Sequence, residues 1–458
     1  MAVVPSHGRS LLLSVVADRV ERMNSRHNSA RADLYSGIWD IQAQHVITCG
    51  RLGAAGGGSR PSPGRAICGI VPPEILRRIA EGAGPDHPDV PDNAAAAAQR
   101  TLEADALLRR QREVFAERGR GDLRGPIPGL PNLRVGERVA EAERRARAKA
   151  EPVVQRAVYD AQHQSKLPGR LVRGEGKPPT ADDPVNRAYD GLGATWQLYW
   201  SAFQRNSLDA KGLELVASVH YEEQYDNAFW DGQQMVFGDG DGTYFNDFTS
   251  SVDVIGHELA HGVTQYTAGL TYVTQSGALN ESVSDCFGSM VKQQVLGQDA
   301  ADADWLIGEG LFTAKVQGVA LRSMKAPGTA YDDPVLGRDP QPVDMDGYVK
   351  LPADAQHDNG GVHTNSGIPN RAFYLAAANI GGRSWDGAGL VWYDVLTGSS
   401  ITKDIDFAGF ARLTVDAAEA RFGAGSSQAR AVKDAWQTVK VLKATAKKTT
   451  KKTTSQRR

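Results

Sequence analysis

The sequence contains little cysteine and no long apolar run. Cysteine occurs three times among 458 residues, at Cys49, Cys68 and Cys286, which is too few and too scattered for a framework of disulfide bonds. No run of about 18 apolar residues is present, so a membrane-spanning helix is not expected. The short apolar run in RSLLLSVVADR, residues 9–19, is weak for a secretion signal, and no clear cleavage pattern follows it.

A large excess of one charge is also missing. The chain has 52 basic and 54 acidic side chains, a net charge of −2, although Arg and Lys gather in residues 105–150 and after Lys440. The tail KKTTKKTTSQRR could serve as a nucleic-acid anchor or be a solvated end. Because it has no interleaved aromatic residues, a solvated end is favoured. No nucleic-acid partner is therefore expected.

Local patterns predict strands first and helices later. Strand-forming residues alternate or cluster in LELVASVHY (213–221) and GQQMVFGD (232–239). Helical spacing follows over 253–267, over about 281–296 and in most of the sequence to about 442. Upstream, CGIVPP predicts a strand-like piece that leads into a helix with proline in its first turn, and a further helical pattern covers AAAAAQRTLEADALLRRQREVFAERG.

The stretch DVIGHELAHG places two histidines four residues apart. On a helix such residues lie about 40° apart around the axis, so His257 and His261 can face one metal ion. Glu258 follows the first histidine and is placed to accept a proton rather than to bind metal. The alternative is an amphipathic surface helix with two solvated histidines.

A catalytic zinc site needs a third protein ligand. Glu281 follows His261 by twenty residues on the next expected helix, in ALNESVSDCFGSMV. Asp285 lies one turn further on the same face, where a carboxylate can accept the outer N–H of a ligand histidine. This combined pattern is far more specific than the histidine motif alone and favours the zinc site.

The two motifs resemble those of the thermolysin-like zinc metallopeptidases. HELAH at His257–His261 and NESVSD at Asn280–Asp285 carry the resemblance, which covers roughly residues 157–442. It implies an α+β fold with two lobes, a β-rich N-terminal one and a mainly α-helical C-terminal one, with the active-site helix between them. It also implies one catalytic Zn²⁺ held by His257, His261 and Glu281, with Asn280 and Asp285 behind the ligands.

The resemblance implies further catalytic and substrate-binding residues. Glu258 would be the general base, while Tyr272 and His363, oriented by Asp358 in DNGGVH, would stabilise the oxyanion. Taken alone, His363 is more often a turn residue and Tyr272 a packing residue. The substrate backbone would be held by Asn227 and Ala228 of NAFW and by Arg322. Phe245, Val254, Ile307 and Leu321 match the family's primed-side pocket, which implies cleavage before a bulky apolar residue.

The calcium region departs from the family pattern. Asp253, Asp304 and Glu309 match calcium ligands, but Lys292 and Leu306 stand where members with a paired site carry glutamate. We therefore expect at most one structural Ca²⁺, with the Lys292 ammonium in the space of the second ion.

An inhibitory segment is suggested upstream. CGIVPP resembles the start of the short propeptide in the protealysin-type subgroup, so Cys68 could bind the zinc and silence the enzyme. The equal alternative is that Cys68 is simply a buried apolar residue; Cys286 is expected to be core packing. The exposed connector GRGDLRGPIPG (119–129) is the expected cleavage region.

These observations predict five segments: a flexible N-terminal segment (1–62), a propeptide with a charged helical connector (63–150), a β-rich lobe ending in the zinc helix (151–268), a mainly helical lobe (269–442) and a basic tail (443–458). The expected function is a latent zinc endopeptidase acting on peptides or proteins. Its own propeptide would inhibit it, and it would be a monomer. The resemblance implies secretion, with storage in the cytoplasm before export as an option. The rival is a catalytically silent relative that binds peptides or partners in the cleft.

Overall fold

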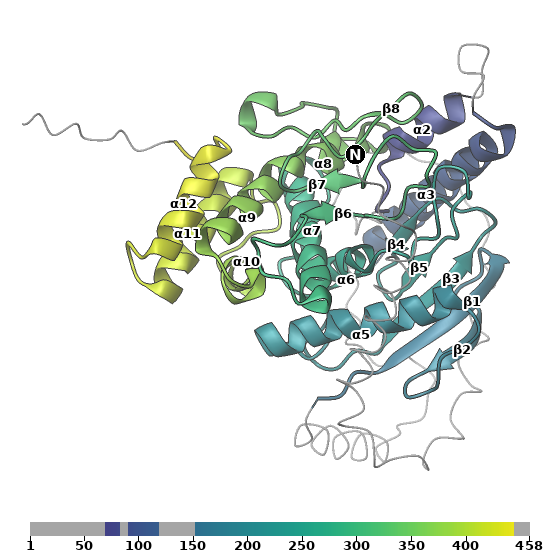
Figure 1. Cartoon of the computed structure of the whole chain (residues 1–458), viewed down its shortest axis with the longest axis horizontal. Helices are drawn as coiled ribbons and strands as arrows, with labels where there is room; N and C mark the ends of the chain where they lie inside the picture. Colours follow the sequence, from purple (N-terminus) through teal and green to yellow (C-terminus); the bar gives the residue numbers. More distant parts are fainter. Residues whose placement is uncertain (1–68, 83–89, 119–151, 444–458) are drawn as a thin grey trace, which may run out of the picture.

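The computed structural model describes residues 69–82, 90–118 and 152–443, with side chains described to Ala106 in the second range. Figure 1 shows a sheet with a long helix, α5, on one side of the molecule and the helices α9 to α12 on the other, with α6 and α7 between them. This mixture confirms the predicted α+β fold class. No helix in the described part combines the length and apolar character needed to cross a membrane.

The sheet has five strands in the order β2-β1-β3-β5-β4. Its central strands β1 and β3 are parallel, as are β3 and β5, while β2 and β4 are antiparallel edge strands. The strands are β1 (Arg156–Gln164), β2 (Arg170–Gly174), β3 (Leu215–Tyr221), β4 (Ala228–Trp230) and β5 (Met235–Phe237). Strands β4 and β5 are buried at every residue, so β4 is an edge strand covered by other parts of the chain.

Helix α5 (Asp183–Phe203) follows β2 and precedes β3 in the sequence, and it packs against the sheet. This helix was not predicted from the sequence. Its glycines explain both the omission and its place in the fold, since glycine lowers helix propensity. An added Cβ at Gly191 would lie 2.4 Å from the Ile255 side chain, and one at Gly193 would lie 2.4 Å from the Arg156 guanidinium. The glycines therefore let α5 pack closely on α6 and on the sheet.

Two long buried helices form the centre of the molecule. Helix α6 (Val252–Tyr266) agrees with the expected range within a residue. Helix α7 (Thr274–Leu296) begins seven residues earlier than the sequence analysis placed it. Its first two turns, TQSGALN, are weak in helix propensity, but Ser276 to Asn280 are buried in the fold. Tertiary packing thus overrides the local preference.

The stretch 297–357 corrects the expectation of mainly helical structure to Leu442. It contains loops, two-residue strands and two 3₁₀ turns: β6 (Leu306–Ile307), β7 (Arg322–Ser323), β8 (Asp332–Asp333), β9 (Gly337–Arg338), η1 (Met345–Gly347) and η2 (Ala355–His357). Helices return afterwards, as α8 (Asp358–Asn365), α9 (Gly367–Ile380), η3 (Ser384–Asp386), α10 (Ala388–Thr397), α11 (Phe407–Phe422) and α12 (Ser427–Thr438). Gly, Asp and Pro are frequent between residues 297 and 357, and these residues favour turns.

Two upstream helices lie against the folded body, α2 (Pro73–Glu81) and α3 (Asp92–Arg118). Figure 1 places them beside β4 and β8. Proline opens α2 as predicted. The expected segment 1–62, the connector 119–129 and nearly all of the basic tail lie outside the described residues, so the predicted segment boundaries stay predictions.

An ion-pair network ties α5 to the sheet and leads to a pH prediction. His220 of β3 contacts Asp239 at 2.8 Å and Asp182, the N-cap of α5, at 3.0 Å. The hydrogen bond to Asp239 raises the pKa of His220 to about 9, against the opposing effect of burial. Because this value lies above the unfolded value of about 6.5, the stabilisation is complete below that pH and is lost as the pH rises through 9.

We expect His220→Gln to lower the free energy of unfolding by about 1 kcal/mol at mildly acidic pH, a modest value because the imidazole is only half-buried. The difference from wild type should vanish in alkaline solution. Urea unfolding midpoints of both proteins across this pH range measure it. A difference that stays constant with pH would contradict a charged His220.

Candidate functional site

Two histidines of α6 face each other inside the molecule. His257 and His261 are 0% and 9% exposed, and their Nε2 atoms are 3.0 Å apart. Helix α6 is buried without a break from Asp253 to Thr264. The alternative of a surface helix with solvated histidines is therefore excluded.

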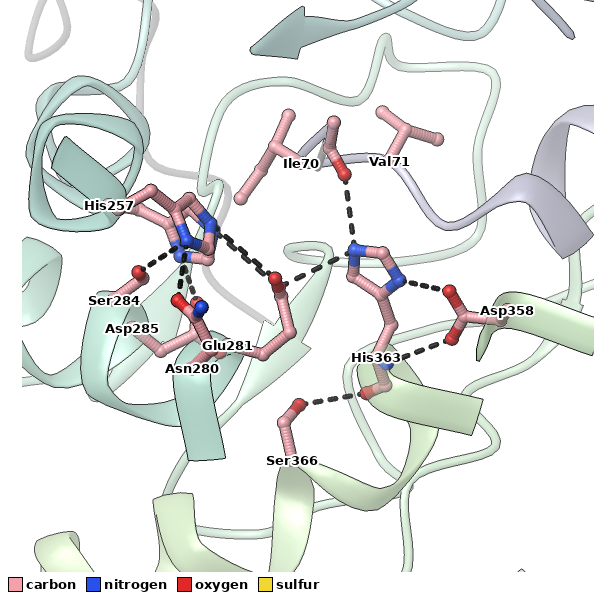
Figure 2. A network of polar contacts seen from close by, with 12 residues as sticks. Ile70, Val71, His257, Asn280, Glu281, Ser284, Asp285, Asp358, His363 and Ser366 are labelled. Atoms are coloured by element: carbon pink, nitrogen blue, oxygen red, sulfur yellow. Dashed lines mark hydrogen bonds and ion pairs between the residues drawn. The ribbon is translucent and has the colours of Figure 1, made fainter. Parts of the chain in front are cut away.

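Glu281 reaches the histidines because α6 and α7 cross closely. An added Cβ at Gly288 would lie 2.4 Å from the Asp253 carbonyl oxygen, so the crossing depends on glycine there. The Glu281 carboxylate lies 3.6 Å from His257 Nε2 and 3.4 Å from His261 Nε2. Figure 2 shows this carboxylate between His257 and His363. In the described part of the chain, His257, His261 and Glu281 are the one group of three or more His, Cys, Asp or Glu residues whose ligand atoms all lie within 4.8 Å of one another.

The geometry of the three donors fits a zinc ion. Ligand distances of about 2.0–2.1 Å separate the donors of a tetrahedral zinc site by about 3.3–3.4 Å, and the donors here lie 3.0, 3.4 and 3.6 Å apart. Burial lowers the pKa of His261 to about 4, so its imidazole is neutral at neutral pH and can bind a metal. The residues present therefore suit the metal that the sequence pattern implies.

The outer nitrogens of both histidines are held from behind. His257 Nδ1 lies 2.7 Å from Asp285, and His261 Nδ1 lies 2.9 Å from Asn280 Oδ1. The Ser284 hydroxyl is also 3.1 Å from His261 Nδ1. Contacts at Nδ1 leave both Nε2 lone pairs directed at the metal position. Ser284 was missed, although it stands within the NESVSD motif.

Asp285 connects His257 to Arg322, one of the predicted substrate-binding residues. Its fully buried carboxylate accepts two hydrogen bonds from Arg322, each 2.9 Å long, and one of 2.7 Å from Asn370 Nδ2. Burial alone would raise the pKa of Asp285, but Arg322 and His257 lower it below its usual range. Asn370 of α9 was not found from the sequence, because it stands 85 residues from Asp285 with no local motif.

Glu258 lies beside the histidines with one carboxylate oxygen fixed. Oε2 accepts a hydrogen bond of 3.0 Å from the Trp230 backbone N–H, and Oε1 is buried with no hydrogen-bond partner in the described structure. Burial, and then the nearby Glu281 charge, raise the pKa of Glu258 well above its ordinary value. Oε1 is therefore the oxygen through which Glu258 could accept a proton in this site.

His363 approaches the same site from α8. The residues Asp358 to Gly361 all have positive φ angles, which turn the chain so that the Asp358 carboxylate meets the histidine. Asp358 accepts from the His363 backbone N–H at 2.8 Å and lies 2.7 Å from His363 Nδ1. Burial alone would lower the pKa of His363, but Asp358 and Glu281 raise it.

Tyr272 and His363 point toward one place. The Tyr272 hydroxyl lies 3.5 Å from His363 Nε2 and donates to Glu281 at 2.6 Å. His363 Nε2 also lies 3.1 Å from the carbonyl oxygen of Gly69, just upstream of α2. The structure thus brings the predicted oxyanion residues within 3.5 Å of each other, and one of them, His363, contacts a peptide carbonyl of the chain itself.

The segment Gly69–Val71 lies along the edge strand β4. Gly69 pairs with Phe229 in antiparallel orientation, and the Ile70 N–H donates to the Ala228 carbonyl at 3.0 Å. The Val71 N–H donates to Asn227 Oδ1, also at 3.0 Å. Arg322 Nη1 donates to the Ile70 carbonyl at 3.0 Å. The predicted substrate-binding residues are therefore occupied by the chain's own backbone, as in strand addition.

The side chain of Ile70 is fully buried in the main apolar cluster. The predicted pocket residues belong to that same cluster and are each 0–2% exposed: Phe245, Val254, Ile307 and Leu321. Gly69 fits only as glycine, because an added Cβ would lie 2.2 Å from Asn227 Nδ2. Cys68, immediately upstream, lies outside the described residues, so its role stays a prediction. Cys286 is a free, buried thiol in the core, as expected.

The predicted calcium ligands surround a lysine. Lys292 Nζ lies 2.9 Å from Asp304, 2.9 Å from Glu309 and 3.7 Å from Asp253. Burial alone would lower the pKa of Lys292, but the three carboxylates raise it. The expected single calcium therefore stays a prediction, and it has to compete with an ammonium group already bonded to two of its three ligands.

We expect Lys292→Met to cost about 3–5 kcal/mol of stability, because it leaves the buried Asp253 without its counter-charge. Urea unfolding with and without added calcium measures the effect. Calcium should raise the midpoint of the variant more than that of wild type, because removal of the ammonium leaves the three carboxylates free for the ion. An equal rise in both proteins would mean that the ion binds beside the lysine without competing with it.

Comparison with known proteins agrees with this geometry. Residues 144–265 match the family model "Thermolysin metallopeptidase, catalytic domain", and residues 268–441 match "Thermolysin metallopeptidase, alpha-helical domain". The chain is 47% identical to an extracellular metalloprotease of Pectobacterium carotovorum over 82% of its own length and 97% of the relative. It is 52% identical to the protease PrtS of a Photorhabdus strain over 62% of this chain and 76% of that one.

A solved structure shares the same architecture. The precursor of protealysin, a metalloproteinase from Serratia proteamaculans, matches with a TM-score of 0.67 and 47% sequence identity, over 82% of this chain and all of the other. The family models, the relatives and the architecture agree with one another. The chain therefore belongs to the thermolysin-like metallopeptidase family and is a metalloendopeptidase.

Proposed function

We propose that this metalloendopeptidase is a latent zinc enzyme, in which the segment Gly69–Val71 blocks the cleft until it is removed. The observation that carries the proposal is the placement of this segment on β4, beside the buried group His257, His261 and Glu281. The three ligands would hold one zinc ion. When bound there, zinc supplies a Lewis acid for the peptide carbonyl.

The chain's own residues would move the protons and stabilise charge. Glu258 Oε1 is the open acceptor in the site and would take the proton of the attacking water, then pass it to the leaving amine. His363 and Tyr272 would donate to the carbonyl oxygen as negative charge develops on it. The contact of His363 Nε2 with the Gly69 carbonyl supports this direction of approach.

The same contacts support a preference on the primed side. If Gly69 occupies the position before the scissile bond, Ile70 occupies the position after it, because the Ile70 N–H and C=O bind Ala228 and Arg322. The buried Ile70 side chain then marks the primed pocket. We propose that substrates are cleaved before Ile, Leu or Phe.

Latency follows from this occupancy. A strand held by the substrate-binding residues excludes other peptides from the cleft until it is released, and Cys68 as a zinc ligand would add to that effect. We also propose that the enzyme acts outside the cell, as the name of the Pectobacterium relative indicates for that protein. Residues 63–150 would be removed as the propeptide.

Hydrolysis of quenched peptides before and after self-processing tests the proposal. The peptides would carry Leu, Phe, Gly or Asp after the scissile bond, with and without a zinc chelator. We expect the intact chain to be nearly silent and the processed chain to cleave the Leu and Phe peptides, with loss under chelation and recovery on adding zinc. An inert, zinc-loaded processed chain would instead favour a silent peptide-binding protein.

A further inference from the structure

A second part of the upstream region contacts the cleft, far from Gly69–Val71 in sequence. Asp105 of α3 is 5% exposed, and its Oδ2 accepts a hydrogen bond of 3.0 Å from Asn227 Nδ2. Its Oδ1 accepts from the Tyr225 hydroxyl. One turn earlier, the Thr101 hydroxyl accepts from the Asp226 backbone N–H at 3.0 Å. One face of α3 therefore binds three consecutive residues just before β4.

These contacts use both ends of a single side-chain amide. Asn227 Oδ1 accepts the N–H of Val71, and Asn227 Nδ2 donates to Asp105. Asn227 is one of the residues proposed to hold the substrate backbone. The strand segment contacts one end of this amide and helix α3 contacts the other, so the upstream region engages both polar atoms of Asn227.

The setting of Asp105 makes its contacts strong. Tyr225 packs in a small buried cluster with Tyr221, Phe229 and Val236, against which Ala104 of α3 also packs. Burial, and then the charge of Asp105, raise the pKa of Tyr225 well above its ordinary value, so the phenol stays a donor. In such a buried environment, hydrogen bonds to a charged acceptor are stronger than those between neutral groups.

The two inhibitory contacts belong to one unit. Helices α2 and α3 pack on each other through residues of the main apolar cluster, among them Ile75, Ile79, Ala94 and Ala98. When two contacts are linked in this way, breaking one leaves the other at high effective concentration. Release of Gly69–Val71 alone would thus leave Asp105 on Asn227.

We propose that Asp105 is a second latch of the latent enzyme, which closes the Asn227 end of the cleft and must be released, together with Gly69–Val71, before a substrate can bind. This inference rests on the latency proposed above and adds a regulatory residue to it. It predicts that the intact chain opens far more readily when the Asp105 carboxylate is absent.

The test measures cleft opening in the full chain without self-cleavage. Glu258→Gln serves as the common background, and a fluorescent peptide with Leu after the scissile position is titrated into the intact, zinc-loaded protein. Adding Asp105→Ala should tighten peptide binding by about 10- to 100-fold, the factor that a hydrogen bond to a charged group contributes. Asp105→Asn keeps the volume and one acceptor, so its effect should be smaller.

Glu103→Ala is the matched control, because Glu103 is an exposed carboxylate on the same helix that accepts a hydrogen bond from Gln99, also of α3. It should leave peptide binding unchanged. Equal binding by the Asp105→Ala and Glu103→Ala chains would overturn the latch, provided that both unfold at the same temperature as their background.

A second measurement separates this proposal from the proposed function. This measurement uses chains that keep the native Glu258 and are fully processed. The Asp105→Ala and wild-type chains then both lack α3 and should have the same kcat and KM. If processed wild type is inert, the proposed function fails. If it is active while Asp105→Ala opens the intact cleft no more than the control does, the latch alone fails.

Discussion

Replacing Glu258 with glutamine is expected to reduce kcat for a peptide substrate by about 10²- to 10⁴-fold, the range that general base catalysis supplies. Glutamine has the same shape, and its side-chain oxygen can still accept the 3.0 Å hydrogen bond from the Trp230 N–H. It cannot take up a proton at the position of Oε1, which is buried and has no hydrogen-bond partner among the residues that the structure describes. The loss should therefore fall on kcat, with little change in KM.

Metal content and a distant control make the result specific. The variant should bind one equivalent of zinc, because Glu258 is not among the three grouped ligands. Glu419→Gln, an exposed change on α11, should behave as wild type. If the Glu258→Gln enzyme keeps more than a tenth of the wild-type kcat, Glu258 is not the general base.

The proposed zinc site could be predicted because its two motifs are local in the sequence. The spacing of His257 and His261 places both on one face of a single helix, and Glu281 lies in one short motif with the outer partners Asp285 and Asn280. Only the close crossing of α6 and α7 at Gly288, which brings the two motifs together, is not visible in the sequence. Sequence also placed α6 within a residue, since its apolar spacing and its burial agree.

Other features could not be found because they depend on distant packing. Helix α5 has glycines that disfavour a helix in isolation, and they are needed where Ile255 and Arg156 approach. The early start of α7 is fixed by burial rather than by propensity. Asn370 and Asp105 are single polar residues whose partners lie 85 and 122 residues away, so no pattern in their own neighbourhood marks them.

The same reasoning applies to the residue that we propose to occupy the primed pocket. The sequence shows Ile70 only as part of a short apolar stretch. Its backbone contacts with Ala228 and Arg322 depend on the tertiary structure and could not be predicted from that stretch. Its side chain is fully buried in the cluster that also contains the predicted pocket residues. If that pocket is the specificity pocket, then latency and substrate preference depend on the same contact.

Replacing Ile70 with aspartate is accordingly expected to raise the activity of the unprocessed chain by at least about 10²-fold. Removing a buried isoleucine gives up about 1.5–3 kcal/mol of burial, and placing a carboxylate in an apolar pocket adds a further penalty. The closed state that Gly69–Val71 and Asp105 hold together therefore loses free energy, so that both contacts should be released together more often. The assay is peptide hydrolysis by freshly purified chain, with mass spectrometry to verify that it is intact.

Ile70→Leu is the matched control, since it keeps an apolar side chain of the same volume and should stay latent. The release should appear as a higher fraction of open enzyme rather than as a changed KM of the processed form, because processing removes residue 70 from both proteins. An Ile70→Asp chain as silent as wild type, in a preparation whose processed form is active, would show that the Gly69–Val71 strand is not what closes the cleft. In that case Asp105 or Cys68 would have to hold the latent state without it.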